Sequence, residues 1–177
     1  MAMDALVKPL LRQPLFQGLK PLQLTEIVRR ADRIVYKPGD VLIEEDKLGE
    51  GAILIVSGEA IRTLSGEEGS PGEPVPEGSM VAELAMLVET VHASTIVART
   101  QIRALKISRE DMHAQMLDDP KLAEHLMGRI AKRLQVLAAE VRAIDEVLSL
   151  LASDDHVSPT AVARAGGLAS SASVSLH

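Results

Sequence analysis

The hydrophobic pattern changes three times along the chain and divides it into four segments. Residues 1–31 have helical spacing, and Pro9, Pro14 and Pro21 are predicted to break this segment into short helices. Residues 32–107 carry short apolar runs separated by turn signals, which is typical of strands. Residues 108–151 return to helical spacing. Residues 152–177 are rich in Ser, Ala and Gly, and we expect a flexible tail there.

The middle segment predicts a β-roll. Many short strands at close, regular spacing favour a barrel or sandwich. We therefore expect a mainly β protein with flanking helices (α+β), namely an antiparallel β-roll or jelly roll with N-terminal helices and a long C-terminal dimerisation helix. The segment SGEEGSPGEPVPEGS is expected to be a long turn. The predicted strands are RIVY, DVLIEE, AILIVSG, AIRTL, STIVA and IRALKI.

Two helices are predicted after the roll. Ser108 and Asp111 form a capping-box-like start, and Asp119 with Pro120 gives an N-cap and first residue for a second, longer helix. Apolar residues in that helix recur at alternating spacings of four and three, which predicts a coiled-coil homodimer through residues 123–151. The alternative is a helix that packs along its own domain. The seam comprises Ala123, Met127, Ile130, Leu134, Leu137, Val141, Ile144, Leu148 and Leu151.

Composition excludes several classes of partner and chemistry. Apolar residues make up 46% of the 177 residues and aromatic residues only 1%, so the core must be aliphatic and base stacking is disfavoured. A net charge of −6 makes nucleic acid an unlikely partner, and no apolar run is long enough for a membrane span. There is no cysteine, which excludes disulfides and thiolate chemistry. We expect a cytoplasmic protein without a membrane partner.

The stretch VAELAMLVETVHASTIVA places a lone acid, Glu83, and a lone imidazole, His92, in an apolar context. With the residues before it, this stretch resembles the phosphate-binding cassette of the cyclic nucleotide-binding domain family. The stretch KPGDVLIEEDKLGEGAILIVSGEAIR resembles the first half of that domain, and AKRLQV resembles the long helix of its catabolite-activator-type members. The resemblance covers residues 14–150.

The resemblance implies a ligand and the residues that hold it. In the family's cassette, N–H groups of a short helix and an Arg hold the cyclic phosphate, a Gly permits close approach, and a Glu accepts the ribose 2′-hydroxyl. Glu83 matches the Glu, and Thr95 and Ala98 match the family's Thr and last Ala. The implied cyclic-nucleotide contacts are Ala82, Glu83, Leu84, Ala85, His92 and Ala93, with Leu137 and Ala138 from the long helix facing the base.

Two of these residues depart from the family pattern. Ala82 stands where the family has Gly, and His92 stands where it has the phosphate-binding Arg. Loss of one partner of a buried charge pair costs about 2–5 kcal/mol. We therefore expect weak or lost binding of ordinary cyclic nucleotides, so no cofactor is certain and cAMP or cGMP, weakly held, is the candidate. Simpler explanations stay open: Glu83 as a helix cap or ion-pair partner, and His92 as an ordinary strand-edge residue.

Three functions follow from these observations. The first is a regulatory sensor module of the cyclic nucleotide-binding type. The second is a ligand-independent dimeric scaffold or protein-interaction module, with a protein effector as partner. The third is a transcription regulator with a truncated helix-turn-helix in SPTAVARAGGLASSASVS, which we disfavour because that segment offers few base-reading side chains. No arrangement of nucleophile, base and orienting group indicates an enzyme, and no histidine spacing indicates a metal site.

Overall fold

The computed structural model describes residues 2–64 and 71–154, which fall into two units, Met1–Ala131 and Lys132–His177. The first unit opens with α1 (Ala2–Leu11), a 3-10 turn η1 (Pro14–Phe16) and α2 (Pro21–Arg30). Pro9 does not end a helix as predicted, because it lies inside α1. It falls in the last turn, where its missing N–H removes only one hydrogen bond from the helix.

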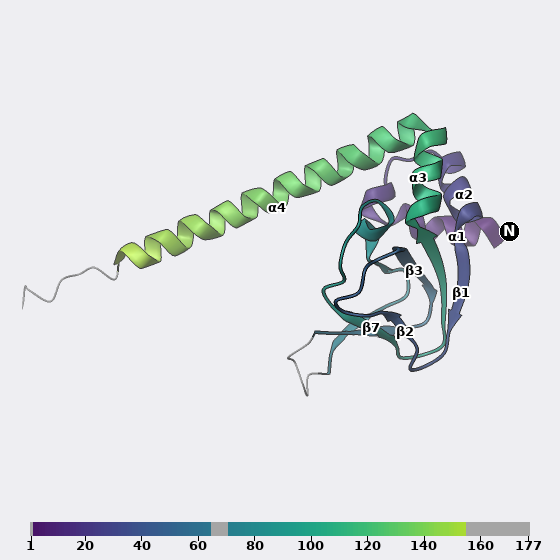
Figure 1. Ribbon diagram of the computed structural model, residues 1–177, viewed down its shortest axis with the longest axis horizontal. Helices are drawn as coiled ribbons and strands as arrows, with labels where there is room; N and C mark the ends of the chain where they lie inside the picture. Colours follow the sequence, from purple (N-terminus) through teal and green to yellow (C-terminus); the bar gives the residue numbers. More distant parts are fainter. Residues whose placement is uncertain (1, 65–70, 155–177) are drawn as a thin grey trace, which may run out of the picture. The chain divides into compact units, whose positions relative to one another are not determined.

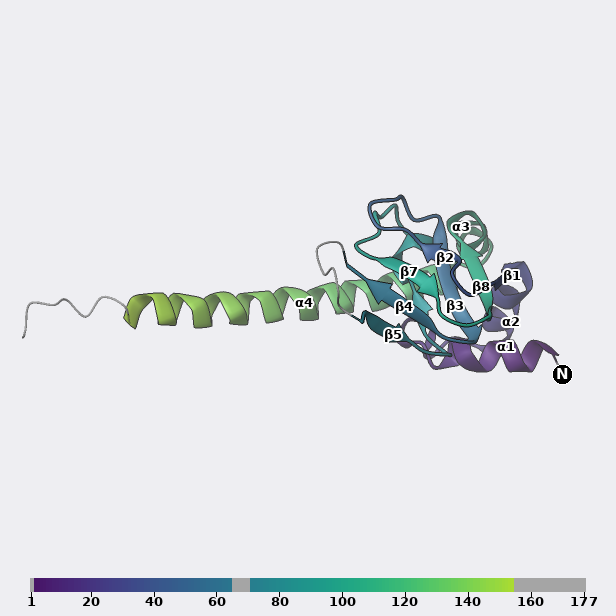
Figure 2. The same ribbon diagram turned by 90° about the horizontal axis from the view of Figure 1, so that it is seen from below.

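Two four-stranded antiparallel sheets form the predicted roll (Figure 1 and Figure 2). One sheet has the order β1-β8-β3-β6, from Asp32–Tyr36, Ile102–Ser108, Gly51–Ser57 and Met80–Val81. The other has the order β2-β7-β4-β5, from Val41–Ile43, Thr95–Ala98, Ala60–Thr63 and Glu73–Val75. The mainly β fold with flanking helices is therefore confirmed.

Two strands lie where the sequence predicted only turn and loop. β5 contains Pro74, which cannot donate to a neighbouring strand. β5 tolerates it because this strand is at the edge of its sheet, where one side of the backbone needs no partner strand. β6 has only two residues, too few for an alternating pattern.

The first unit has two hydrophobic clusters. One fills the roll between the sheets and includes Ile53, Ile55, Ile96 and Ile102. The other lies between the roll and the helices α1, α2 and α3 (Arg109–Asp118), which gather on one side of the roll (Figure 1). Phe16, at the centre of this second cluster, is fully buried.

The predicted helix starts are confirmed. The Ser108 side chain accepts the N–H of Asp111 at 3.0 Å and caps α3. Asp119 Oδ1 accepts the N–H groups of Lys121 and Leu122 at 3.1 and 3.2 Å and caps α4 (Pro120–Asp154). No helix in the described part of the chain is long and apolar enough to cross a bilayer. The predicted flexible tail and helix-turn-helix segment lie almost wholly outside the described residues.

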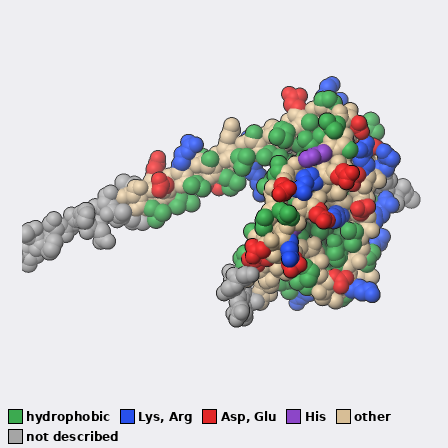
Figure 3. All heavy atoms as spheres, viewed as in Figure 1, with side chains coloured by type: hydrophobic (Ala, Val, Ile, Leu, Met, Phe, Trp, Pro, Cys, Tyr) green, Lys and Arg blue, Asp and Glu red, His purple; other side chains and the backbone are tan. Residues whose placement is uncertain are grey.

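The start of α4 packs on its own domain through a face that coincides only in part with the heptad seam, since Ile130 of the seam packs against the helix-side cluster. Leu122 and Leu126 are fully buried in the helix-side cluster, whereas Met127 of the predicted seam is 54% exposed. From residue 131 to residue 146 every side chain of α4 is exposed, and Figure 3 shows hydrophobic side chains uncovered along this helix. The seam residues among them are thus apolar and uncovered in the single chain.

Candidate functional site

The predicted cassette begins at a left-handed residue. Ala82 has φ 52° and ψ 37° and precedes the short 3-10 helix η2 (Glu83–Met86). In the described part of the chain, Asp46 is the one other non-glycine residue with positive φ. A residue with a Cβ is strained in this conformation, and glycine is not. The turn is held because Ala82 packs against the roll interior while Ala85 and Met86 are fully buried.

Backbone hydrogen bonds tie the second arm of the cassette to the loop between β2 and β3. The His92 N–H donates to the Lys47 carbonyl at 2.9 Å, and the Asp46 N–H donates to the His92 carbonyl at 2.9 Å. The Gly49 N–H donates to the Thr90 carbonyl at 2.8 Å. The backbone of His92 is therefore fixed on both sides by one loop.

The Thr95 hydroxyl extends this connection. Its Oγ1 accepts the N–H of Glu45 at 3.1 Å, so the loop is joined to the first residue of β7 as well. Thr95, which matches the family's Thr, therefore makes a hydrogen bond within the chain that ties the loop to β7.

The His92 ring lies against Gly49, beside η2. A Cβ at position 49 would lie 2.9 Å from His92 Cε1 and 2.6 Å from the Cβ of Ala85. Both distances are shorter than ordinary carbon contacts, so a side chain at this position would displace the ring or the helix. The absence of a side chain at Gly49 is what allows the imidazole and Ala85 of η2 both to pack against this residue.

His92 also lines a hollow of about 290 Å³ formed by β2, the following loop and Lys106. The Lys106 Nζ donates to Glu50 Oε2 at 2.8 Å, and this bond holds the pKa of the Glu50 carboxyl below its ordinary value. Lys47 lines the same hollow and makes no ion pair with a described residue. The hollow therefore places the His92 imidazole and Lys47 beside two carboxylates, Glu44 and Glu50, of which Glu50 is paired with Lys106.

The structure brings some of the predicted site residues together. Ala82, the half-buried Glu83 and the buried Ala85 form one turn, and His92 meets this turn at Gly49. Four further predicted residues are exposed: Leu84 at 36%, Ala93, which follows His92 in the chain, Leu137 at 47%, and Ala138.

Leu137 and Ala138 belong to the second unit, Lys132–His177. Their predicted contact with a base therefore stays a prediction. Within the described residues, no group of three or more His, Asp or Glu side chains is placed to hold a metal ion.

Sequence reasoning missed the partners of His92. Gly49 and Lys47 lie in KPGDVLIEEDKLGEGAILIVSGEAIR, a stretch used only for its resemblance to the first half of the domain. The signal that could have identified Gly49 is the pair of glycines at positions 49 and 51 immediately before a buried strand, since glycine there often marks a close backbone approach.

Comparison with known proteins identifies the family of this fold. The family model "Cyclic nucleotide-binding domain" matches residues 33–119. A cAMP-dependent protein kinase regulatory subunit from Aspergillus niger is 35% identical over 97 residues, which is 55% of this chain and 23% of that protein. The cyclic AMP receptor protein of Thermus thermophilus is 30% identical over 125 residues, covering 69% of this chain and 57% of the relative. The chain thus matches only part of the length of these relatives.

A solved structure shows the same fold. The crystal structure of the Thermus thermophilus catabolite activator protein superposes with a TM-score of 0.60 at 24% identity, covering 75% of this chain and 63% of that one. The family match spans the roll, the cassette and α3. Through residues 33–119, the chain belongs to the cyclic nucleotide-binding domain family.

Proposed function

We propose that this protein is a regulatory sensor module whose cassette holds ordinary cyclic nucleotides, cAMP or cGMP, weakly or not at all. Membership of the family supports the sensor role, as do relatives whose names include a cAMP-dependent kinase regulatory subunit and a cyclic AMP receptor protein. Weak binding of cyclic nucleotides is supported by the residues at two positions of the cassette, Ala82 and His92.

The observation that carries the proposal is the position of the His92 ring. The ring lies against Gly49 and η2, and its backbone is tied to Lys47 and Asp46. An imidazole in this place is shorter than a guanidinium and cannot form the two parallel hydrogen bonds that Arg makes to a phosphate. A cyclic phosphate bound here would lose a charge-assisted contact worth about 2–5 kcal/mol, or roughly 30-fold or more in affinity.

Ala82 weakens the site in a second way. Its left-handed backbone is the conformation that glycine adopts without strain, and the turn is fixed by the buried residues that follow it. The methyl group therefore occupies space beside the backbone that a family glycine leaves to the ligand. Glu83, at the ribose-binding position, still follows it at the start of η2.

The second unit offers a surface through which the domain could act on a partner. The seam residues of α4 from Leu134 to Leu148 are apolar and about half exposed or more in the single chain. A partner copy that covered this seam would bury several large side chains, each worth about 1.5–3 kcal/mol. We propose a homodimer through residues 123–151 on this ground.

A ligand-independent dimeric scaffold is the second candidate function. The same exposed seam favours it, together with the two departures in the cassette. A scaffold differs from a sensor in one measurable respect. Restoring Arg at position 92 and Gly at position 82 should not give a scaffold affinity for a cyclic nucleotide.

Isothermal titration with cAMP, cGMP and a cyclic dinucleotide distinguishes the two functions. The protein is compared with a His92→Arg, Ala82→Gly variant, and the matched control is Val91→Arg, Ala82→Gly, which places the same charge one residue away at an exposed position that is not among the implied contacts. For a sensor, the His92→Arg variant should bind at least about 30-fold more tightly than the natural chain, and the Val91→Arg control should not. If the folded His92→Arg variant gives no heat at millimolar nucleotide, the sensor proposal fails and the scaffold stands.

A further inference from the structure

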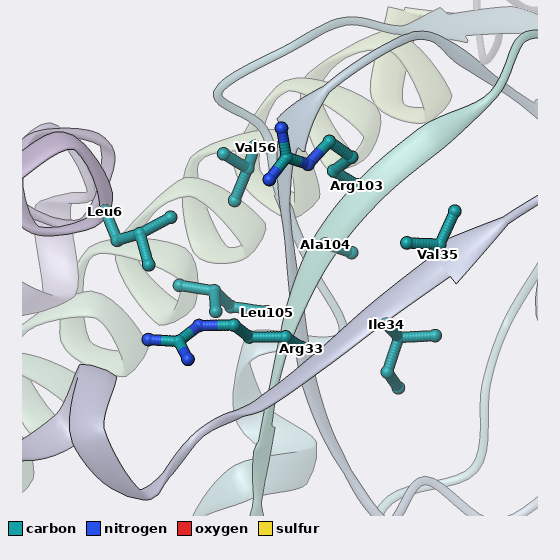
Figure 4. A pocket seen from close by; sticks show the side chains of 8 residues that line it. All are labelled: Leu6, Arg33, Ile34, Val35, Val56, Arg103, Ala104 and Leu105. Atoms are coloured by element: carbon teal, nitrogen blue, oxygen red, sulfur yellow. The ribbon is translucent and has the colours of Figure 1, made fainter. Parts of the chain in front are cut away.

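A second hollow, of about 450 Å³, opens on the outer face of the β1-β8-β3-β6 sheet beside α1 (Figure 4). It shares no lining residue with the hollow at His92. Its floor is apolar, and the two charged residues that line it are both arginines. The side chains that matter are Leu6, Val35, Val56 and Leu105 on the floor and Arg33 and Arg103 at its margins.

Strand register places the two arginines on one face. Arg33 pairs with Leu105 and Val35 pairs with Arg103 across β1 and β8. Cross-strand partners share a face, as do residues two apart in a strand, so both arginines lie on the face that carries Val35 and Leu105. In Figure 4 the two guanidinium groups extend toward the same side of the sheet as Leu6, with Leu105 between them.

Neither guanidinium group makes an ion pair or hydrogen bond with a described residue, whereas Arg62 and Arg99 of the other sheet pair with Glu73 and Glu59. The chain has 25 acidic and 19 basic residues, so acceptors for arginine are plentiful on its surface. The hollow therefore combines an apolar floor with two arginines that have no such partners. This combination is complementary to a ligand that is anionic and partly apolar.

We propose that this hollow is a docking site for a short segment of a protein partner in which a large apolar side chain lies between two carboxylates. The apolar side chain would cover the exposed Val35 and the half-buried Val56, and the carboxylates would pair with Arg33 and Arg103. A protein segment fits better than a small molecule because the site is open: Val35 is 58% exposed. A small ligand normally buries most of its surface, and this hollow would leave much of it in water.

Fluorescence anisotropy with synthetic peptides tests the site on the full chain. The probe is a labelled peptide series in which Leu or Phe is flanked by Asp or Glu, and a second series has Lys in place of each acid. The acidic series should bind and the Lys series should not. Arg33→Glu and Arg103→Glu should each weaken binding about fivefold or more, because each replaces an attraction by a repulsion. Val35→Ser should weaken binding without a change in charge.

Arg99→Glu is the matched control, since it makes the same change in charge at an exposed arginine of the other sheet and should leave binding unchanged. Melting temperatures show whether each single variant is folded, and cyclic-nucleotide titration keeps this site separate from the cassette. Equal binding of the two peptide series, or equal loss with Arg99→Glu, would overturn the proposal. Arginine-dependent binding of phosphatidylglycerol vesicles or of a DNA duplex without acidic-peptide binding would overturn it as well.

Discussion

A Cβ atom at Gly49 would lie 2.9 Å from Cε1 of His92, so this glycine and this histidine occupy adjoining space in the cassette. The two residues are also linked through the loop backbone, because His92 bonds to Lys47 and Asp46 while Gly49 bonds to Thr90. The position of the imidazole therefore depends on a residue far from it in sequence.

Gly49→Ala should destabilise the domain by about 1–3 kcal/mol, because the added methyl would overpack the contact between His92 and Ala85. Urea unfolding measures this loss. The matched control is Gly128→Ala on α4, where nothing lies within 4 Å of the new methyl and helix propensity should raise stability by up to about 1 kcal/mol. Equal effects of the two substitutions would contradict the proposed contact.

Ala82→Gly should stabilise the domain by about 0.5–1 kcal/mol. Relief of the left-handed strain is worth about 1–2 kcal/mol, and the extra freedom of glycine in the unfolded chain takes back part of it. Ala85→Gly, three residues later, removes a fully buried methyl group and should lose about 1.5 kcal/mol. Equilibrium unfolding measures the stability of both variants. If Ala82→Gly lost as much stability as Ala85→Gly, the left-handed backbone of Ala82 would not be strained.

Leu137→Asn with Ile144→Asn should convert the proposed dimer to a monomer. These seam residues are 47% and 59% exposed in the single chain, and a partner helix would bury both. Light scattering at micromolar concentration measures the mass. Val136→Asn is the control, since Val136 is 50% exposed but lies off the seam, and it should leave the dimer intact. A monomeric mass for the natural chain would exclude the dimer.

Asp119 should contribute stability that is lost in acid. Gln23 Nε2 donates to Asp119 Oδ2 at 2.7 Å, and this bond, with the N–H groups of Leu122 and Lys121, holds the pKa of Asp119 below its ordinary value. A lowered pKa in the folded state gives stability that is fully present above the ordinary value of about 3.9 and is lost as pH falls through the folded-state value.

The melting temperature of Asp119→Asn should therefore be lower than that of the natural chain at pH 7, and the gap should close as the pH falls below about 4. Asparagine keeps one acceptor for the N–H groups of Lys121 and Leu122, but it removes both the charge and the second oxygen that accepts from Gln23. Other carboxyls whose pKa is lowered, Glu26 and Glu50, titrate in both proteins and cancel in the difference. A gap that does not change with pH would show that the charge of Asp119 has no part in the cap.

The sequence by itself determined the class of fold and the boundaries of its longest elements. Strand periodicity gave six of the eight strands, and the caps at Ser108 and Asp119 marked the starts of α3 and α4. These features are local, because a cap or an alternating run is specified by residues that are neighbours in the chain. The resemblance of VAELAMLVETVHASTIVA to the family's cassette likewise pointed to Glu83 and His92 as candidate site residues.

Only the tertiary structure decided which residues meet. It assigned Leu122 and Leu126, and not Met127, to the domain side of α4, because the choice of face depends on the position of the helix-side cluster. It showed that Ala82 adopts a left-handed backbone, which the buried residues after it impose against alanine's own preference. It placed the His92 ring on Gly49, a contact between two loops that no periodic pattern within either loop encodes.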